Sequence, residues 1–149
     1  MLETSFSTNT GVVRVTDAMP VGDECHIIRQ VECIAGSMTM RMQCSPMFDY
    51  GQHQPHIEER GRDVIFEWND EQLRLRANTS LTCDSANVYA QFEIQAGEKV
   101  WFILSYLSPD QVIFPVPDAE KTLSRCAHWW HNWISRCQYR GRWEERVKR

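Results

Sequence analysis

Apolar and polar residues alternate along much of the first two-thirds of the chain. They do so in residues 38–44 and again in 88–95, and a period of two is typical of half-buried strands. Residues 26–34 predict another strand. Residues 100–106 are almost continuously apolar, which is typical of a strand covered on both faces. Seven or eight short strands at this spacing predict a mainly β fold, an antiparallel β-sandwich over residues 1–107.

Two turn signals indicate hairpins within this region. Asn9-Thr-Gly11 separates two strand-like runs, and Asn69-Asp70 separates two more. Asparagine, aspartate and glycine tolerate the backbone conformations that tight turns require. Strands that follow one another closely are therefore expected to pair as antiparallel neighbours.

The hydrophobic period changes after residue 107. Residues 108–117 contain three prolines and predict a linker. Asp118 suits a helix N-cap, and Glu120 in the first turn complements the helix dipole. An amphipathic linker helix is expected over residues 118–138, and the start of a second, truncated helix over 141–149. The apolar stripe of the first helix consists of Ala119, Leu123, Cys126, Ala127, Trp130, Trp133, Ile134 and Cys137.

Charge, apolar content and cysteine spacing limit the possible binding partners and the cellular compartment. A net charge of −4 disfavours nucleic acid as the main partner. No run approaches the ~20 apolar residues of a membrane span, and the first residues do not form a secretory signal. The six cysteines include no Cys-x-x-Cys pair, so free, mostly buried thiols in a cytoplasmic protein are expected.

Six short motifs occur in a fixed order and cover nearly the whole chain. They are Val12–Pro20 (VVRVTDAMP), Ile28–Gly36 (IRQVECIAG), Pro46–Gly51 (PMFDYG), Ala96–Glu98 (AGE), Trp130-x-x-Trp133 and Tyr139–Trp143 (YRGRW). With these motifs the chain resembles the N-terminal β-sandwich region of bacterial glycoside hydrolase family 15 proteins, the glucoamylase- and trehalase-like group.

This resemblance implies a supersandwich-like domain and a linker helix that leads to an (α/α)6 barrel. In the family, two glutamates of the barrel perform inverting hydrolysis of α-glucosidic bonds. The match ends near the first barrel helix, so no catalytic residue and no cofactor are expected in this chain. The implied partner is such a barrel, in cis or in trans. Family members have further strands before the matching segment, so the sandwich is expected to be incomplete, with an open edge.

The bend at Phe48–Gly51 supplies the substrate-cleft candidates. It would present the Asp49 carboxylate and the Tyr50 phenol towards a neighbouring domain, with Phe48 and Arg41 beside them. The alternative is an ordinary tight turn, in which Asp49 bonds its own backbone and Gly51 supplies a positive φ.

The aromatic residues near the C-terminus have two interpretations. Trp130, Trp133, Arg142 and Trp143 are assigned to packing at an interdomain junction, because an aromatic stripe at helical spacing is usually buried. Trp129 falls off the stripe and is the candidate for stacking on a sugar ring. Two histidine pairs, 53 with 56 and 128 with 131, supply too few ligands for zinc, which takes three or four from the protein. No metal site is expected.

Three hypotheses of function follow. The first is a non-catalytic accessory domain that packs on a glucoamylase- or trehalase-like barrel and shapes its sugar site. The second is a stand-alone carbohydrate-binding module for α-glucosidic sugars. The third is a structural β-protein whose open edge and helix pair between copies in a homo-oligomer. The sequence leaves the substrate of a parent enzyme open among trehalose, starch and other glucosides.

Overall fold

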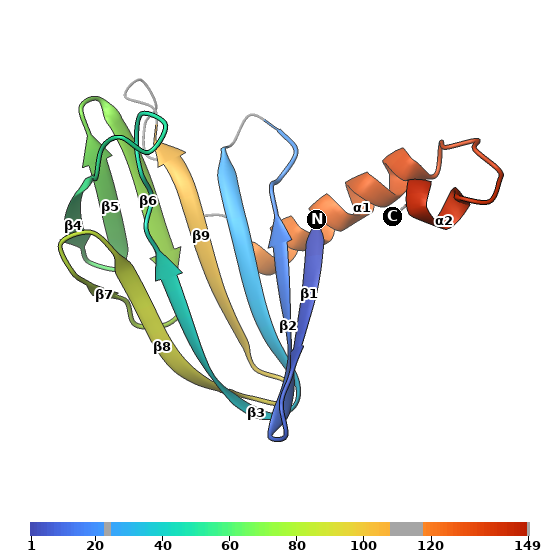
Figure 1. Ribbon diagram of the computed structural model, residues 1–149, viewed down its shortest axis with the longest axis horizontal. Coiled ribbons are helices and arrows are strands. Elements are labelled where there is room, and N and C mark those ends of the chain that lie inside the picture. Colours follow the sequence, from blue (N-terminus) through green and yellow to red (C-terminus); the bar gives the residue numbers. More distant parts are fainter. Residues whose placement is uncertain (23–24, 108–117, 149) are drawn as a thin grey trace.

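The computed structural model describes residues 1–22, 25–107 and 118–148. This part of the chain is mainly β, and Figure 1 shows its strands and two helices. The strands are β1 (Leu2–Ser7), β2 (Gly11–Ala18), β3 (His26–Cys44), β4 (His56–Arg60), β5 (Asp63–Trp68), β6 (Glu71–Ala77), β7 (Thr82–Cys83), β8 (Val88–Gln95) and β9 (Lys99–Leu107). The helices are α1 (Ala119–Ile134) and α2 (Glu144–Val147).

The long strand β3 connects the two layers of the fold. Its first half pairs with β2 and β9, and the first layer has the order β1-β2-β3-β9-β6-β5-β4. Its second half, from Ser37 to Cys44, pairs with β8, which in turn pairs with β7. All of these pairings are antiparallel. The sequence predicted two separate strands here, whereas the structure has one strand of 19 residues.

Gly36 is the reason that β3 can turn from one layer into the other. Its φ is 69°, in the left-handed region that favours glycine. A Cβ at this position would collide with the carbonyl oxygen of Thr10. The backbone therefore bends at Gly36 while the strand remains continuous.

The main core lies between the two layers. Phe66, Leu75 and Phe102 of the first layer belong to the same buried cluster as Ala90 and Ile94 of the second. The alternation seen along residues 88–95 directs one face of β8 into this core. The predicted antiparallel sandwich is confirmed.

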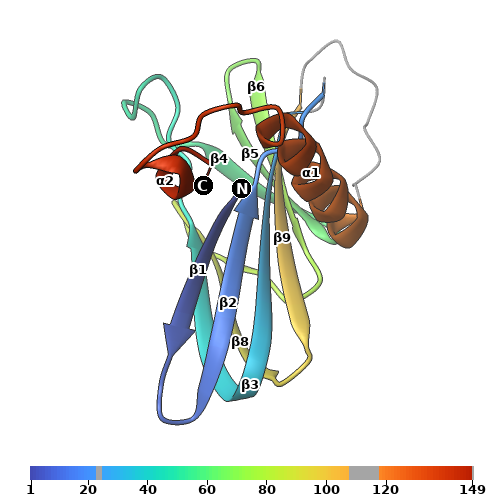
Figure 2. The same cartoon turned by 90° about the vertical axis from the view of Figure 1, so that its right-hand side faces the viewer.

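Helix α1 packs on the outer face of the first layer (Figure 2). Ala119, Leu123 and Cys126 form a second buried cluster with Ala18, Ile28 and Ile103. Asp118 caps the helix, because its side chain accepts a hydrogen bond of 3.0 Å from the Lys121 N–H. These contacts fix the start of the helix on the sheet.

The helix ends at Ile134, four residues before the predicted boundary at 138. The Ser135 hydroxyl donates to the Asn132 carbonyl at 2.8 Å, and the next backbone N–H groups bond three residues back in tight turns. The predicted linker, residues 108–117, lies outside the described residues.

Candidate functional site

The second half of α1 exposes a cluster of aromatic rings. Trp129, Trp130 and Trp133 are 42%, 39% and 51% exposed. We call these three residues the tryptophan cluster. The ring centroids of Trp129 and Trp130 are 4.7 Å apart and those of Trp130 and Trp133 are 5.7 Å apart, both edge to face. The rings contact one another while a large part of their surface faces solvent.

The sheet supports only the first half of the apolar stripe. Leu123 and Cys126 are buried, whereas Trp130 and Trp133 are not. Figure 1 shows the end of α1 and α2 projecting beyond the strands. Within the described chain, Trp130 and Trp133 are thus exposed to the same degree as Trp129, from which the sequence pattern had separated them.

The segment after α1 has basic side chains on an aromatic ring. The guanidinium carbons of Arg142 and Arg146 each lie 4.9 Å from the centroid of the Trp143 ring. Glu144 bonds to Lys148 at 2.6 Å and to Arg140 at 2.9 Å, and these bonds lower the pKa of its carboxyl, with Lys148 the larger cause. Trp143 itself is 46% exposed.

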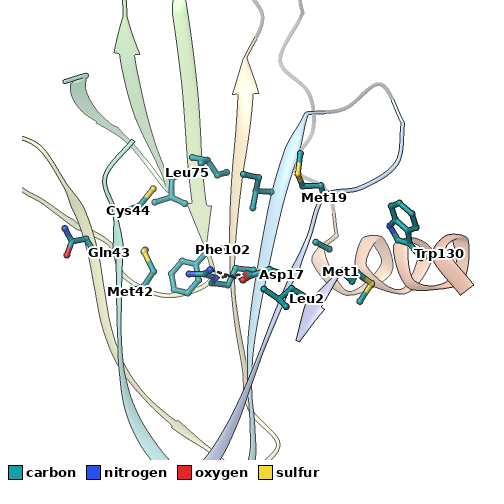
Figure 3. A pocket seen from close by; sticks show the side chains of 14 residues that line it. Met1, Leu2, Asp17, Met19, Met42, Gln43, Cys44, Leu75, Phe102 and Trp130 are labelled. Atoms are coloured by element: carbon teal, nitrogen blue, oxygen red, sulfur yellow. Dashed lines mark hydrogen bonds and ion pairs between the residues drawn. The ribbon is translucent and has the colours of Figure 1, made fainter. Parts of the chain in front are cut away.

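An open hollow of about 670 Å³ lies between the layers and reaches Trp130 (Figure 3). Its lining is mostly apolar and includes Met1, Leu2, Met19 and Phe102. Its charged groups are paired with each other, since Arg29 donates to both carboxylate oxygens of Asp17, at 2.7 and 2.9 Å. The hollow therefore has an apolar surface with a satisfied ion pair.

Cys44 also lines this hollow. Burial raises the pKa of its thiol to about 11, so the group is neutral at physiological pH. Because the thiolate is the nucleophilic form of cysteine, Cys44 is not suited to covalent catalysis.

A second hollow is lined by residues of the β4–β5 turn, of the end of β6 and of the segment that follows it, together with Trp101. Glu59 and Asp63 are among its lining residues. The guanidinium of Arg76 forms hydrogen bonds to both oxygens of Asp63, one of them at 2.6 Å. Asp63 and Arg76 are therefore each other's partners in this hollow.

The turn after β3 has an unusual backbone. Asp49, Tyr50 and Gly51 have φ values of 48°, 56° and 86°, so two residues with side chains adopt the left-handed conformation in succession. Phe48 is buried and its N–H bonds to the His53 carbonyl at 2.9 Å. Tyr50 is fully exposed. Strain of this kind persists only where the surrounding structure enforces it.

The structure places the predicted cleft residues in two locations. The Asp49 carboxylate lies 3.8 Å from the ring of His53, which stacks on Trp68 at 4.5 Å. Arg41 instead lies over the Tyr89 ring at 5.0 Å on the second layer. The sequence did not predict the His53–Trp68 stack, because no period or motif connects two residues in different elements.

Among the described residues, no group of three or more histidine, cysteine or acidic side chains is arranged to hold a metal ion. His131 uses its Nδ1 in a 2.8 Å contact with the Ala127 carbonyl within the helix. No helix among the described residues has the length and apolar character needed to cross a membrane.

Comparison with known proteins shows which proteins this chain resembles. No family model matches the chain. It is similar to trehalases. The trehalase of Mycobacterium tuberculosis is 26% identical over 91% of the chain, and that of Thermoplasma volcanium is 25% identical over 100%. The trehalase of Mycolicibacterium smegmatis is 25% identical over 91%. The chain spans about a quarter of the length of these relatives.

One solved structure, described as a kojibiose phosphorylase from the human microbiome, aligns with 91% of the chain and 21% of its own length. Its TM-score is 0.46 and its sequence identity is 9%.

Proposed function

We propose that this chain is a non-catalytic accessory region of a trehalase-like glycoside hydrolase. The observation that carries the proposal is the similarity to trehalases, which extends over nearly all of this chain but over only a quarter of each relative. The active partner would be an (α/α)6 barrel, in cis or in trans, that holds the two catalytic glutamates. Membership of glycoside hydrolase family 15 is part of the same proposal.

The tryptophan cluster supports a docking role for α1. Burying one such ring removes about 150–250 Å² from water, and tryptophan is enriched among the residues that contribute most to binding at interfaces. We assign Trp130, Trp133, Arg142 and Trp143 to the junction with the barrel. The first half of α1 fixes this surface to the sandwich.

The strained turn supports a role in shaping a sugar site. Its backbone holds the Asp49 carboxylate and the Tyr50 hydroxyl out from the sandwich, and both groups bond well to sugar hydroxyls. Phe48 is buried and anchors the turn, and His53, whose carbonyl accepts from the Phe48 N–H, stacks on Trp68. Arg41 stays a proposed cleft residue, approaching from the second layer.

The acidic residues support the absence of catalysis in this chain. Inverting hydrolysis needs one protonated and one ionised carboxyl, roughly 6.5–9.5 Å apart, and the proton donor has a raised pKa. Hydrogen bonds instead lower the pKa of Glu58, Asp84, Asp118 and Glu144. Arg29 and Arg76 donate hydrogen bonds to the carboxyl groups of Asp17 and Asp63.

The test compares the purified chain, the (α/α)6 barrel that the proposal requires, and the two together. We expect no release of glucose from trehalose or maltose by the chain alone, and higher activity of the barrel when the chain is bound. Replacing both Trp130 and Trp133 by alanine should weaken association about 30-fold or more, as expected for interface tryptophans. His128→Ala, on the same helix, is the matched control. Glucose release by the chain alone would refute the proposal.

A second candidate function is a stand-alone carbohydrate-binding module, which the exposure of Trp129 favours. A sugar-binding platform needs rings that lie in one plane, whereas the interplanar angles in the tryptophan cluster are 86° and 79°. Titration calorimetry with trehalose and maltooligosaccharides separates the two functions. Heat that disappears in Trp129→Ala would favour the module.

A further inference from the structure

The outer edge of strand β1 is open for pairing. In the described chain, β1 pairs with β2 alone, and all six of its residues are exposed. Figure 2 shows β1 as the outermost strand at its side of the first layer. An edge of this kind presents unpaired N–H and C=O groups that can accept another strand.

The two edges of the first layer differ in how they are protected. The opposite edge strand, β4, follows Pro55 and contains two glutamates, one arginine and one histidine in five residues. Charges and proline are common protection against edge pairing. β1 has one charged residue, Glu3, and exposes Leu2 and Phe6 by 61% and 47%. Its pairing with β2 also runs without a register shift.

The hairpin geometry shows which residues of β1 offer their backbone to the edge. The Thr8 N–H donates to the Gly11 carbonyl at 2.9 Å, which makes these two residues a hydrogen-bonded pair. Hydrogen-bonded pairs alternate along an antiparallel ladder, so the even-numbered residues of β1 bond towards β2. Glu3, Ser5 and Ser7 then direct their backbone N–H and C=O groups outward.

These features define a self-complementary register. A two-fold axis through Thr4, perpendicular to the sheet, places Thr4 opposite Thr4 of a second copy, Leu2 opposite its Phe6, and Glu3 opposite its Ser5. Glu3 and Ser5 are outward-bonding residues, so the ladder continues. The apolar pair falls at a non-hydrogen-bonded position, where side chains are closest. A shift of the axis to Glu3 would place the Glu3 carboxylates of the two copies directly opposite each other, which is unfavourable.

We propose that two copies of this chain associate through antiparallel pairing of their β1 edges about an axis at Thr4. The first layer then continues as one sheet through both copies. Five residues of β1 from each copy, Leu2 to Phe6, pair in this register. They bury less than the 1,200–2,000 Å² of a standard interface, so the dimer is a reversible one with a dissociation constant in the micromolar range or weaker. This inference does not depend on the proposed function.

Sedimentation velocity over a series of protein concentrations tests the pairing, with two charge variants at the axis. Thr4→Glu and Thr4→Lys each place like charges opposite each other, so each should weaken the dimer roughly fivefold or more. An equimolar mixture of the two should restore association, because the charges then attract. Thr4→Val is the matched control and should dimerise like the unmodified chain. Circular dichroism and the melting temperature verify that each variant is folded.

Other occupants of the edge give different results. An unmodified chain that stays monomeric at millimolar concentration overturns the proposal, and so does a Thr4→Glu variant that dimerises with the same dissociation constant as the unmodified chain. A dimer that disappears in Trp133→Ala but not in Thr4→Glu would assign the contact to the tryptophan cluster. The assay contains neither sugar nor barrel, so its outcome is separate from that of the proposed function.

Discussion

At the scale of single residues, the turn at Asp49 and Tyr50 has the clearest conflict between local preference and observed structure. A residue with a side chain loses about 1–2 kcal/mol in the left-handed conformation, and Tyr50 adopts it with φ 56° while fully exposed. No contact of its own ring compensates for this loss in the isolated chain. We infer that function, and not the stability of the fold, is the reason for a tyrosine at this position.

Tyr50→Gly should therefore stabilise the isolated chain by about 0.5–1 kcal/mol, the relief of strain less the entropy that glycine adds to the unfolded state. Urea denaturation measures the change. The proposed role of this turn in a sugar site predicts that the same variant also lowers the activity of the proposed complex with a barrel, because the phenol is lost. Asn69→Gly is the control at φ 52°, where asparagine already tolerates this conformation. A clear loss of stability in Tyr50→Gly would contradict the strain argument.

At the scale of elements, α1 consists of a buried half and an exposed half. Leu123 is 7% exposed and packs on Ile28 and Ile103, whereas Trp133 is 51% exposed. Leu123→Ala should cost about 2–4 kcal/mol of unfolding free energy through lost burial and a residual cavity. Trp133→Ala should cost less than about 1 kcal/mol of unfolding free energy and act mainly on the proposed binding of a barrel. Equal losses from both variants would show that the second half of the helix is also supported by the sandwich.

The start of α1 should respond to acid. The hydrogen bond from the Lys121 N–H lowers the pKa of the Asp118 carboxyl below its ordinary value of 3.8. A carboxyl whose pKa is depressed by folding stabilises the folded state above its unfolded pKa, and this contribution is lost as pH falls through the folded pKa. Asp118→Asn keeps an acceptor for the cap but cannot titrate. Its melting temperature should fall less than that of the unmodified chain between about pH 6 and pH 2, as measured by tryptophan fluorescence.

Elements that depend on local signals could be predicted from the sequence. The hairpins at Asn9-Thr-Gly11 and Asn69-Asp70 are confirmed, because their turn residues also set the pairing of the adjacent strands. The sequence assigned Trp130 and Trp133 to an interdomain junction, but it could not show how much of each ring the sandwich itself covers. Helical spacing shows which residues share a face, but the length of that face that is covered depends on where the sheet beneath it ends.

At the scale of the whole molecule, the relation between the layers depends on one strand that serves both. The sequence pattern predicted a strand on each side of Gly36, but it did not predict that the two form one continuous strand. That continuity depends on pairing with β2, β9 and β8, which come from distant parts of the chain. The two layers share the main core, so they should unfold together. The bend at Gly36 is then a requirement of the entire sandwich.

Gly36→Ala tests this requirement, and Gly61→Ala is its matched control. The two glycines have similar φ values, 69° and 65°. At Gly61 a Cβ has open space, whereas at Gly36 it meets the backbone of Thr10 and Gly11. Gly61→Ala should lose about 1 kcal/mol of unfolding free energy, because an alanine is strained in the left-handed conformation. Gly36→Ala should lose more than about 2 kcal/mol of unfolding free energy, because backbone atoms cannot move aside as a flexible side chain does.

Urea unfolding followed by circular dichroism and by tryptophan fluorescence should give one coincident transition in each variant. Separate transitions in Gly36→Ala would show that the layers are stable independently and that the bend only connects them.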